Sequence, residues 1–290
     1  MKTTAIIFSK DRTLQLKSLL LSLRTKTDLP EEAINIIYKN TIPEISYRPL
    51  IDEFKCQFIE QDIFLDDVKK IVSQSSSEYF LFMVDDLIFR DKASLERVER
   101  IMEEHANIDS FCFRMGKNIQ SFPQPEFEKI EENIVAWDTK RDLGKHWNYF
   151  WDLSSSLYHR KLVEKYLTKC RLDKETFPNP FEDHFYQCMP NTKPTSAHIA
   201  AINAARFALK RKSAKIACFE TSRCMTQGVN LVADIPDDSR EETFSPLELH
   251  SKMLEGFIVA HDNLPPPNQP NAGTRFFRLE KLPDTMMWKK

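Results

Sequence analysis

Two adjacent aspartates follow the most apolar run of the chain and form its strongest candidate for chemistry. Asp85 and Asp86 come directly after Tyr79–Val84, a run with the composition of a buried strand. In open α/β sheets ligands bind beyond the carboxyl ends of the strands, and two carboxylates cannot be buried there without a cation or hydrogen-bond donors. Mg²⁺ and Mn²⁺ bind one or two carboxylates together with phosphate oxygens, so the pair indicates a metal–diphosphate site. A solvated acidic turn is the alternative interpretation.

An aromatic segment from His146 to Asp152 is the second candidate. Aromatic faces are suitable platforms for sugar rings, and Asp and Asn oxygens accept hydrogen bonds from hydroxyl groups. The segment is therefore typical of a carbohydrate-binding surface. The alternative is that its rings belong to the hydrophobic core, where such side chains are commonly buried.

The first 115 residues contain the elements that must position the aspartates. Short apolar runs alternate there with segments of helical periodicity, which is the pattern of βα units and a mostly parallel sheet. We predict an α/β fold with helices flanking the sheet, and Asp85 at the end of a central strand. The predicted strands of this half are residues 4–8, 34–38, 55–59 and 79–84, with helices after Arg12, over 64–74 and from about Ala93.

The pattern becomes mixed after residue 115. Ile134–Trp137 is predicted as a short antiparallel piece, and the stretch after Leu264 is a proline-rich linker. We therefore expect a mixed C-terminal half followed by an extended tail over 264–290. The remaining predicted elements are strands over 110–114 and 215–219 and helices over 161–169, 181–188, 196–212 and 246–261.

Composition excludes several classes of protein. A formal charge of −2 does not indicate nucleic acid as a partner, and the five glycines are too far apart to build a dinucleotide-binding or P-loop motif. The six cysteines contain no C-x-x-C pair, and the apolar run near the N-terminus is too short for a secretory signal. These features predict a cytoplasmic protein with reduced thiols.

Three short motifs together give the chain a family resemblance. The segments IIFSKDR, FLFMVDDLIF and FEDHF, in that order, resemble a GT-A fold glycosyltransferase of the family 2-like, nucleotide-diphospho-sugar transferase kind. The similarity covers about residues 4–235. It implies a GT-A domain over 1–263, with a nucleotide-binding half over 1–115 and an acceptor-binding half over 116–263.

The resemblance implies roles at the first and fourth strands. Asp86 would ligate Mn²⁺ or Mg²⁺, and Asp85 would contact the sugar or ribose. Val84 departs from the full D-x-D form, in which a carboxylate stands first. The end of the first strand would bind the nucleotide through Ser9, Lys10, Asp11 and Arg12.

The resemblance also implies roles in the second half. Glu182 and Asp183 match an acidic pair in which one carboxylate deprotonates the acceptor hydroxyl; Asp183 is our candidate base and Glu182 the alternative. Both acids are also explained as first-turn residues that cap a helix. Arg223 would neutralise phosphate from a lid after the last strand. The acceptor would contact Trp147, Tyr149, Trp151, Asp152 and Ser155.

The resulting expectation is transfer of a sugar from a nucleotide-diphosphate donor to an acceptor hydroxyl. The resemblance implies an inverting, metal-assisted reaction in bacterial-type surface polysaccharide or glycoconjugate synthesis, with a carbohydrate or lipid-linked acceptor. A basic group from Arg206 to Lys215 is either a solvated helix face or a contact to the inner membrane surface. The alternatives are a sugar-1-phosphate nucleotidyltransferase and a non-catalytic nucleotide-sugar or carbohydrate-binding module.

Overall fold

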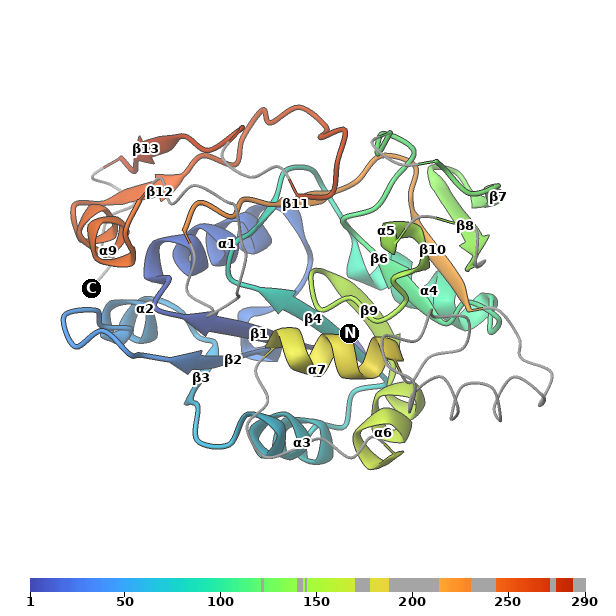
Figure 1. The fold of residues 1–290 in the computed structure, drawn as a ribbon, viewed down its shortest axis with the longest axis horizontal. Helices are drawn as coiled ribbons and strands as arrows, with labels where there is room; N and C mark the ends of the chain where they lie inside the picture. The colour runs from blue at the N-terminus through green and yellow to red at the C-terminus, as the bar shows by residue number, and fades with distance from the viewer. Residues whose placement is uncertain are drawn as a thin grey trace.

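The computed structural model describes residues 1–120, 123–139, 143, 145–169, 178–187, 214–230, 244–271 and 275–283. A nine-stranded sheet forms the centre of this part of the chain, and helices cover both of its faces (Figure 1).

The first half of the chain follows the predicted alternation of strands and helices. Each strand begins within two residues of its predicted start, because an apolar run between polar turns is a local signal. The elements are β1 (Thr3–Lys10), α1 (Thr13–Lys26), η1 (Glu31–Ala33), β2 (Ile34–Lys39), α2 (Arg48–Glu53), β3 (Gln57–Glu60), α3 (Phe64–Gln74), β4 (Tyr79–Val84), β5 (Leu87–Phe89) and α4 (Leu95–Glu104).

The second half contains more and shorter strands than the pattern predicted. The elements are β6 (Ser110–Cys112), β7 (Glu128–Glu131), β8 (Ile134–Asp138), α5 (Lys145–Asn148), β9 (Ser156–His159), α6 (Arg160–Lys169), α7 (Pro178–Gln187), β10 (Lys215–Phe219), β11 (Cys224–Thr226), α9 (Pro246–Leu254), β12 (Phe257–Val259) and β13 (Leu279–Lys281). The helix predicted over 196–212 lies outside the described residues.

The strands of the central sheet lie in the order β3-β2-β1-β4-β9-β6-β10-β8-β7. β1 pairs in parallel with both β2 and β4, whereas β9 is antiparallel to its neighbours β4 and β6. β8 is antiparallel to β10, as predicted for this segment. The expected mostly parallel sheet with a mixed C-terminal half is thus confirmed.

Alternate residues of each central strand pack on opposite faces of the sheet. Ala5 and Ile7 of β1 belong to one core cluster, with α1, α4 and α9, whereas Ile6 and Phe8 belong to a second, with α3, α6 and α7. The two-residue period of a strand requires this division, so burial on both sides explains the continuous apolar runs. In Figure 1, α1 and α9 lie above the sheet, and α3 and α6 lie below it.

The predicted helix over 246–261 is too long. The helix ends at Leu254, and the chain turns at Gly256, whose φ of 88° favours glycine over residues that carry a side chain. Residues 257–259 then form β12 and pair with β13 of the tail. Part of the proline-rich tail is therefore tied to the body of the protein by a small sheet.

None of the helices that the structure describes is both long enough and apolar enough to cross a bilayer.

Candidate active site at the carboxyl ends of β1 and β4

The order of the strands reverses between β1 and β4. From β1 the chain proceeds outward to β2 and β3 on one side, then returns to place β4 on the other side of β1. In doubly wound α/β sheets the crevice beyond the carboxyl ends of two such strands is the usual ligand site. Arg12 follows β1 at this edge, and Asp85 and Asp86 follow β4.

Arg12 bridges the two aspartates. Its Nη1 lies 3.2 Å from Oδ1 of Asp85 and 3.3 Å from Oδ2 of Asp86, and its side chain is 11% exposed. Its Nε donates to Oδ1 of Asn230 at 2.9 Å, and its Nη2 donates to the carbonyl oxygen of the same residue. We call Arg12, Asp85 and Asp86 the Arg12 site.

A sharp turn between β1 and α1 positions Arg12. Asp11 adopts a φ of 54°, and its buried carboxylate accepts a hydrogen bond from the backbone N–H of Thr41 at 2.7 Å. Ser9 is hydrogen-bonded to the hydroxyl of Tyr47, which also accepts the backbone N–H of Arg12. Asp11 and Ser9 therefore hold the turn and the neighbouring loop in place. Their predicted nucleotide contacts stay predictions.

Asp85 is almost fully buried and bonded to its own chain. Its Oδ2 accepts the backbone N–H of Lys10 at 3.2 Å, in addition to the contact with Arg12. Burial raises the pKa of the Asp85 carboxyl above its ordinary value, against the lowering effect of the Arg12 charge. The positive charge of Arg12 thus favours the ionised form of this carboxylate.

Several buried polar atoms beside the Arg12 site have no hydrogen-bond partner in the described part of the protein. They are Oδ1 of Asp86, Oε1 of Gln15 and both amide atoms of Gln227. These three residues and Asp85 line one narrow crevice, together with Ile88 and Val259. Because buried polar groups are nearly always satisfied in native proteins, such a group of atoms indicates a place where a polar ligand binds.

The arrangement does not fit the predicted divalent metal at Asp86. Arg12 already stands between the two carboxylates, so a divalent ion shared by them would have to displace its guanidinium. Among the described residues no three His, Cys, Asp or Glu side chains gather closely enough to hold an ion. The free Oδ1 of Asp86 would be a single protein ligand, and the other ligands of an ion there would have to come from the diphosphate.

A second charged cluster lies further along the same edge of the sheet. Arg114 follows β6, and its Nη2 lies 2.9 Å from Oδ2 of Asp152, with both side chains nearly buried. The Asp152 charge raises the pKa of Arg114 although burial opposes it, and Glu182 adds to this effect. We call Arg114, Asp152 and Glu182 the Arg114 cluster. Asp152 was predicted as an acceptor contact, whereas Arg114 was missed.

The predicted acidic pair lies in α7, beside the Arg114 cluster. Oε1 of Glu182 accepts the backbone N–H of Leu153 at 2.9 Å, so this carboxylate is held against the segment before β9. Asp183 belongs to the same helix, but its side chain lies outside the described part of the protein. α7 is anchored by Phe181, whose ring packs against those of Phe64 and Trp151.

The aromatic segment is mostly interior. The rings of Trp147 and Trp151 are fully buried, and Trp151 stacks on Tyr158 with ring centroids 4.4 Å apart. Tyr149 is half-buried, and Ser155, with a φ of 80°, is buried beside β4 through its backbone bond to Phe82. The observed packing is that of the alternative interpretation, a hydrophobic core. A contact of these residues with an acceptor stays a prediction.

Arg223 is placed away from the crevice. Its guanidinium forms an ion pair with Asp91 and lies 4.6 Å from the centroid of the Phe219 ring. The neighbouring β11 pairs with β5 directly after the acidic pair, and the backbone N–H of Gln227 donates to the carbonyl of Asp86 at 2.8 Å. Gln227 and Asn230 of the predicted lid segment contact the Arg12 site. A contact of Arg223 with phosphate stays a prediction.

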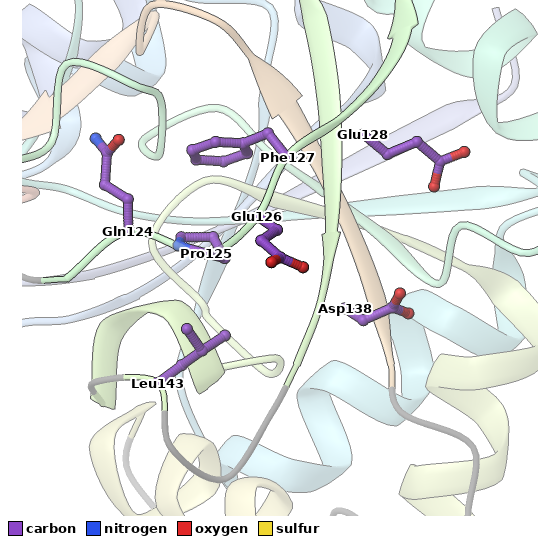
Figure 2. A pocket seen from close by; sticks show the side chains of 7 residues that line it. All are labelled: Gln124, Pro125, Glu126, Phe127, Glu128, Asp138 and Leu143. Atoms are coloured by element: carbon purple, nitrogen blue, oxygen red, sulfur yellow. The ribbon is translucent and has the colours of Figure 1, made fainter.

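A larger cavity of about 400 Å³ lies elsewhere (Figure 2). It is lined by residues 124–128 with Asp138 and Leu143, at the start of β7 and the end of β8. Given the strand directions, this is the edge of the sheet opposite to the Arg12 site. One of its carboxylates, Glu128, is already paired with Lys215. The smaller crevice combines the switch point with unsatisfied polar atoms, so we regard it as the functional site.

Sequence reasoning missed the residues that reach the site from distant segments. Asn230 is 218 positions from Arg12, and Gln15 faces the site from the buried side of α1. Arg114 ends a run of strand-like residues, and a charged residue at a strand end was a signal that could have been followed. The amide side chains carry no motif that would have revealed them.

Comparison with known proteins gives one curated relative above the level of chance. No family model matches the chain. The chain is 28% identical over 178 residues to the bifunctional glycosyltransferase pgtA of Dictyostelium discoideum. The match supports the resemblance to glycosyltransferases. It covers 53% of this chain but only 23% of the relative, so about half of this chain corresponds to about a quarter of that protein.

Solved structures show a more distant likeness. Residues 1–349 of TarS from S. aureus give a TM-score of 0.46 at 16% identity, and cover 76% of this chain and 58% of TarS. The same protein in complex with UDP gives 0.47 at 14% identity, with the same coverage. A cytidylyltransferase from Leptospira borgpetersenii gives 0.38 at 10% identity, covering 63% of this chain and 72% of that one. At these TM-scores the likeness supports no conclusion about function.

Proposed function

We propose that the chain transfers a glycosyl group from a nucleotide-diphosphate sugar to an acceptor hydroxyl, at the edge formed by β1, β4 and β9. The observation that carries the proposal is the polar crevice at the switch point, where buried atoms of Asp86, Gln15 and Gln227 have no partners in the described residues. The identity to pgtA supports the choice of a glycosyltransferase among enzymes of this architecture.

The chain's own residues suggest a division of labour along the edge. The Arg12 site and the amides of Gln15 and Gln227 bind the donor, because their buried polar atoms have no partners among the described residues and Arg12 offsets part of the negative charge of the two aspartates. Asp183, with Glu182 as the alternative, removes the proton of the attacking hydroxyl; a positioned base of this kind contributes about 10²- to 10⁴-fold in rate.

Calorimetric titration with UDP, GDP, dTDP and CDP tests the donor site directly. We expect one nucleotide to bind the wild type, and Gln227→Leu to weaken that binding. Leu254→Gln, an exposed position on α9, is the control that should leave binding unchanged. Failure of all four nucleotides, with and without Mn²⁺, would remove the transferase proposal and leave a carbohydrate-binding module as the better explanation.

The base is tested by Asp183→Asn and Glu182→Gln. The variant that lacks the base should keep its affinity for the donor and lose transfer of the sugar to acceptor or water. The release of free nucleoside diphosphate measures this transfer. A loss of donor affinity in parallel with turnover would assign the residue to binding or to folding instead.

A further inference from the structure

We infer that Arg12 is the built-in counter-cation of Asp85 and Asp86, and that the nucleotide donor binds at this site without a divalent metal. The inference rests on the proposed function for its second half. The first half concerns only the chain's own residues and is tested separately.

The position of one nitrogen atom carries the argument. Nη1 of Arg12 lies 3.2 Å from one carboxylate and 3.3 Å from the other, between the two groups that a shared metal would have to join. A guanidinium stays protonated at every physiological pH, so its charge cannot be withdrawn to admit another cation. A divalent ion bound to the same carboxylates would be a near neighbour of that charge, and the repulsion is strong in a buried site.

Arg12 is also locked in this position. Nε and Nη2 both donate to Asn230, and the side chain is largely buried. Displacement of the guanidinium would break these bonds and leave two carboxylates beside each other in a site with little solvent. Metal binding would therefore have to compensate the loss of the whole network.

The remaining negative charge of the pair faces a second source of positive potential. Gln15, in the first turn of α1, lines the same crevice as Asp85 and Asp86, so the pair lies at the N-terminal end of that helix. The free N–H groups of a first helical turn favour negative charge. Arg12 and the start of α1 together supply what a metal would supply at an acidic pair. Val84, in place of a third carboxylate, is consistent with this arrangement.

The first test uses Mn²⁺ alone and needs no substrate. Calorimetric and electron paramagnetic resonance titrations should detect no Mn²⁺ binding by the wild type. Arg12→Gln removes the charge and adds an amide oxygen beside Asp85 and Asp86, so this variant should bind about one Mn²⁺ and gain thermal stability from it. Stoichiometric Mn²⁺ binding by the wild type that Asp86→Asn abolishes would overturn the inference.

The second test adds nucleotide. Affinity of the wild type for the nucleotide that it binds should be the same in EDTA and in Mn²⁺. Arg12→Gln should lose at least about tenfold in EDTA, because the two carboxylates without their counter-charge would repel the anionic diphosphate, and regain part of it in Mn²⁺. A wild type that binds nucleotide only with metal overturns the inference and leaves the proposed function intact. A protein that binds no nucleotide at all contradicts the proposed function, while the Mn²⁺ titration still decides the role of Arg12.

Two further variants separate the charge from a general effect on folding. Arg24→Gln, at the other end of α1, removes an arginine paired with Glu31 and should change neither titration. Arg12→Lys keeps a positive charge without the planar fork, so it should stay independent of metal with weaker nucleotide binding. Metal-dependent nucleotide binding by Arg12→Lys would show that charge alone does not fill the role and would contradict the inference, even if Arg12→Gln does not fold.

Discussion

The Arg12 site and the Arg114 cluster each set one buried arginine against two carboxylates at the same edge of the sheet, yet their hydrogen bonding differs. In the Arg114 cluster the chain itself satisfies the acids: Asp152 accepts the backbone N–H of Ser154, and Glu182 that of Leu153. In the Arg12 site Oδ1 of Asp86 has no partner in the described residues. Nε of Arg114 is also without a partner there, so we base the distinction on the acids. We expect Asp152 to belong to the scaffold and Asp86 to be completed by a ligand.

Arg114→Met should have the largest effect on stability. It leaves Asp152 buried without its counter-charge, and breaking a buried pair in this way costs about 3 to 5 kcal/mol. Urea unfolding measures the change. Arg100→Met is the matched control, because Arg100 forms ion pairs on the surface, and such pairs contribute about 0 to 1 kcal/mol. Equal losses in the two variants would contradict the scaffold role of the Arg114 cluster.

Asp152→Asn should destabilise the protein less than Arg114→Met does, because it keeps the shape of the side chain and the acceptor for the backbone N–H of Ser154. It removes one charge-assisted hydrogen bond to Arg114, which corresponds to about 1.5 to 3 kcal/mol. The same unfolding experiment measures it. Affinity for nucleotide should be unchanged, since the change is in the scaffold; a loss of affinity without a loss of stability would move Asp152 to the functional side of the comparison.

Asp85→Asn and Asp86→Asn should differ in their effects on stability and on nucleotide affinity, although the two residues are adjacent and chemically alike. Asp85 accepts both Arg12 and the backbone N–H of Lys10, so its loss should destabilise the fold by roughly 1 to 3 kcal/mol. Asp86 accepts Arg12 through one oxygen and its other oxygen is free, so its substitution should cost less stability than that of Asp85 and reduce nucleotide affinity instead. Thermal melts and calorimetric titrations of both variants measure these effects. A larger loss of stability in Asp86→Asn than in Asp85→Asn would make Asp86 the structural residue.

Gln227→Leu should have the smallest effect on stability, or a slightly favourable one. Both amide atoms of Gln227 are buried without partners in the described residues, and replacing unsatisfied polar atoms with apolar ones of similar shape is nearly neutral. The hydrogen bond from its backbone to Asp86 is unaffected. Nucleotide affinity should fall while the melting temperature holds. A substantial loss of stability would show that the amide already has a structural role and is not kept for a ligand.

The fold was largely predictable because its signals are local. The bounds of α3, β4 and β10 agree with the predicted ranges, since each is an apolar or amphipathic run between polar turns. The strand β12 was not predictable in this way. Its residues continue the helical pattern of α9, and pairing with β13 in the tail makes them a strand.

The candidate site was predictable only in part. Asp85 and Asp86 were found because two acids after a buried strand are conspicuous in the sequence. Asp152 was found for its hydroxyl-binding chemistry, but the structure pairs it with Arg114, a contact across 38 positions that periodicity cannot show. The rings of Trp147 and Trp151 were equally compatible with a surface and with a core, and packing decided for the core.

The sequence by itself determined where the strands of the first half begin, to within two residues, and that Asp85 and Asp86 follow β4. These properties depend on backbone geometry and on burial within a few residues. Only the tertiary structure decided that β4 returns beside β1 and that β9 enters the sheet antiparallel between β4 and β6. Strand pairing is a choice among distant segments with similar patterns, made by their combined packing and hydrogen bonds. That choice places Arg12 between Asp85 and Asp86 and so defines the chemistry of the site.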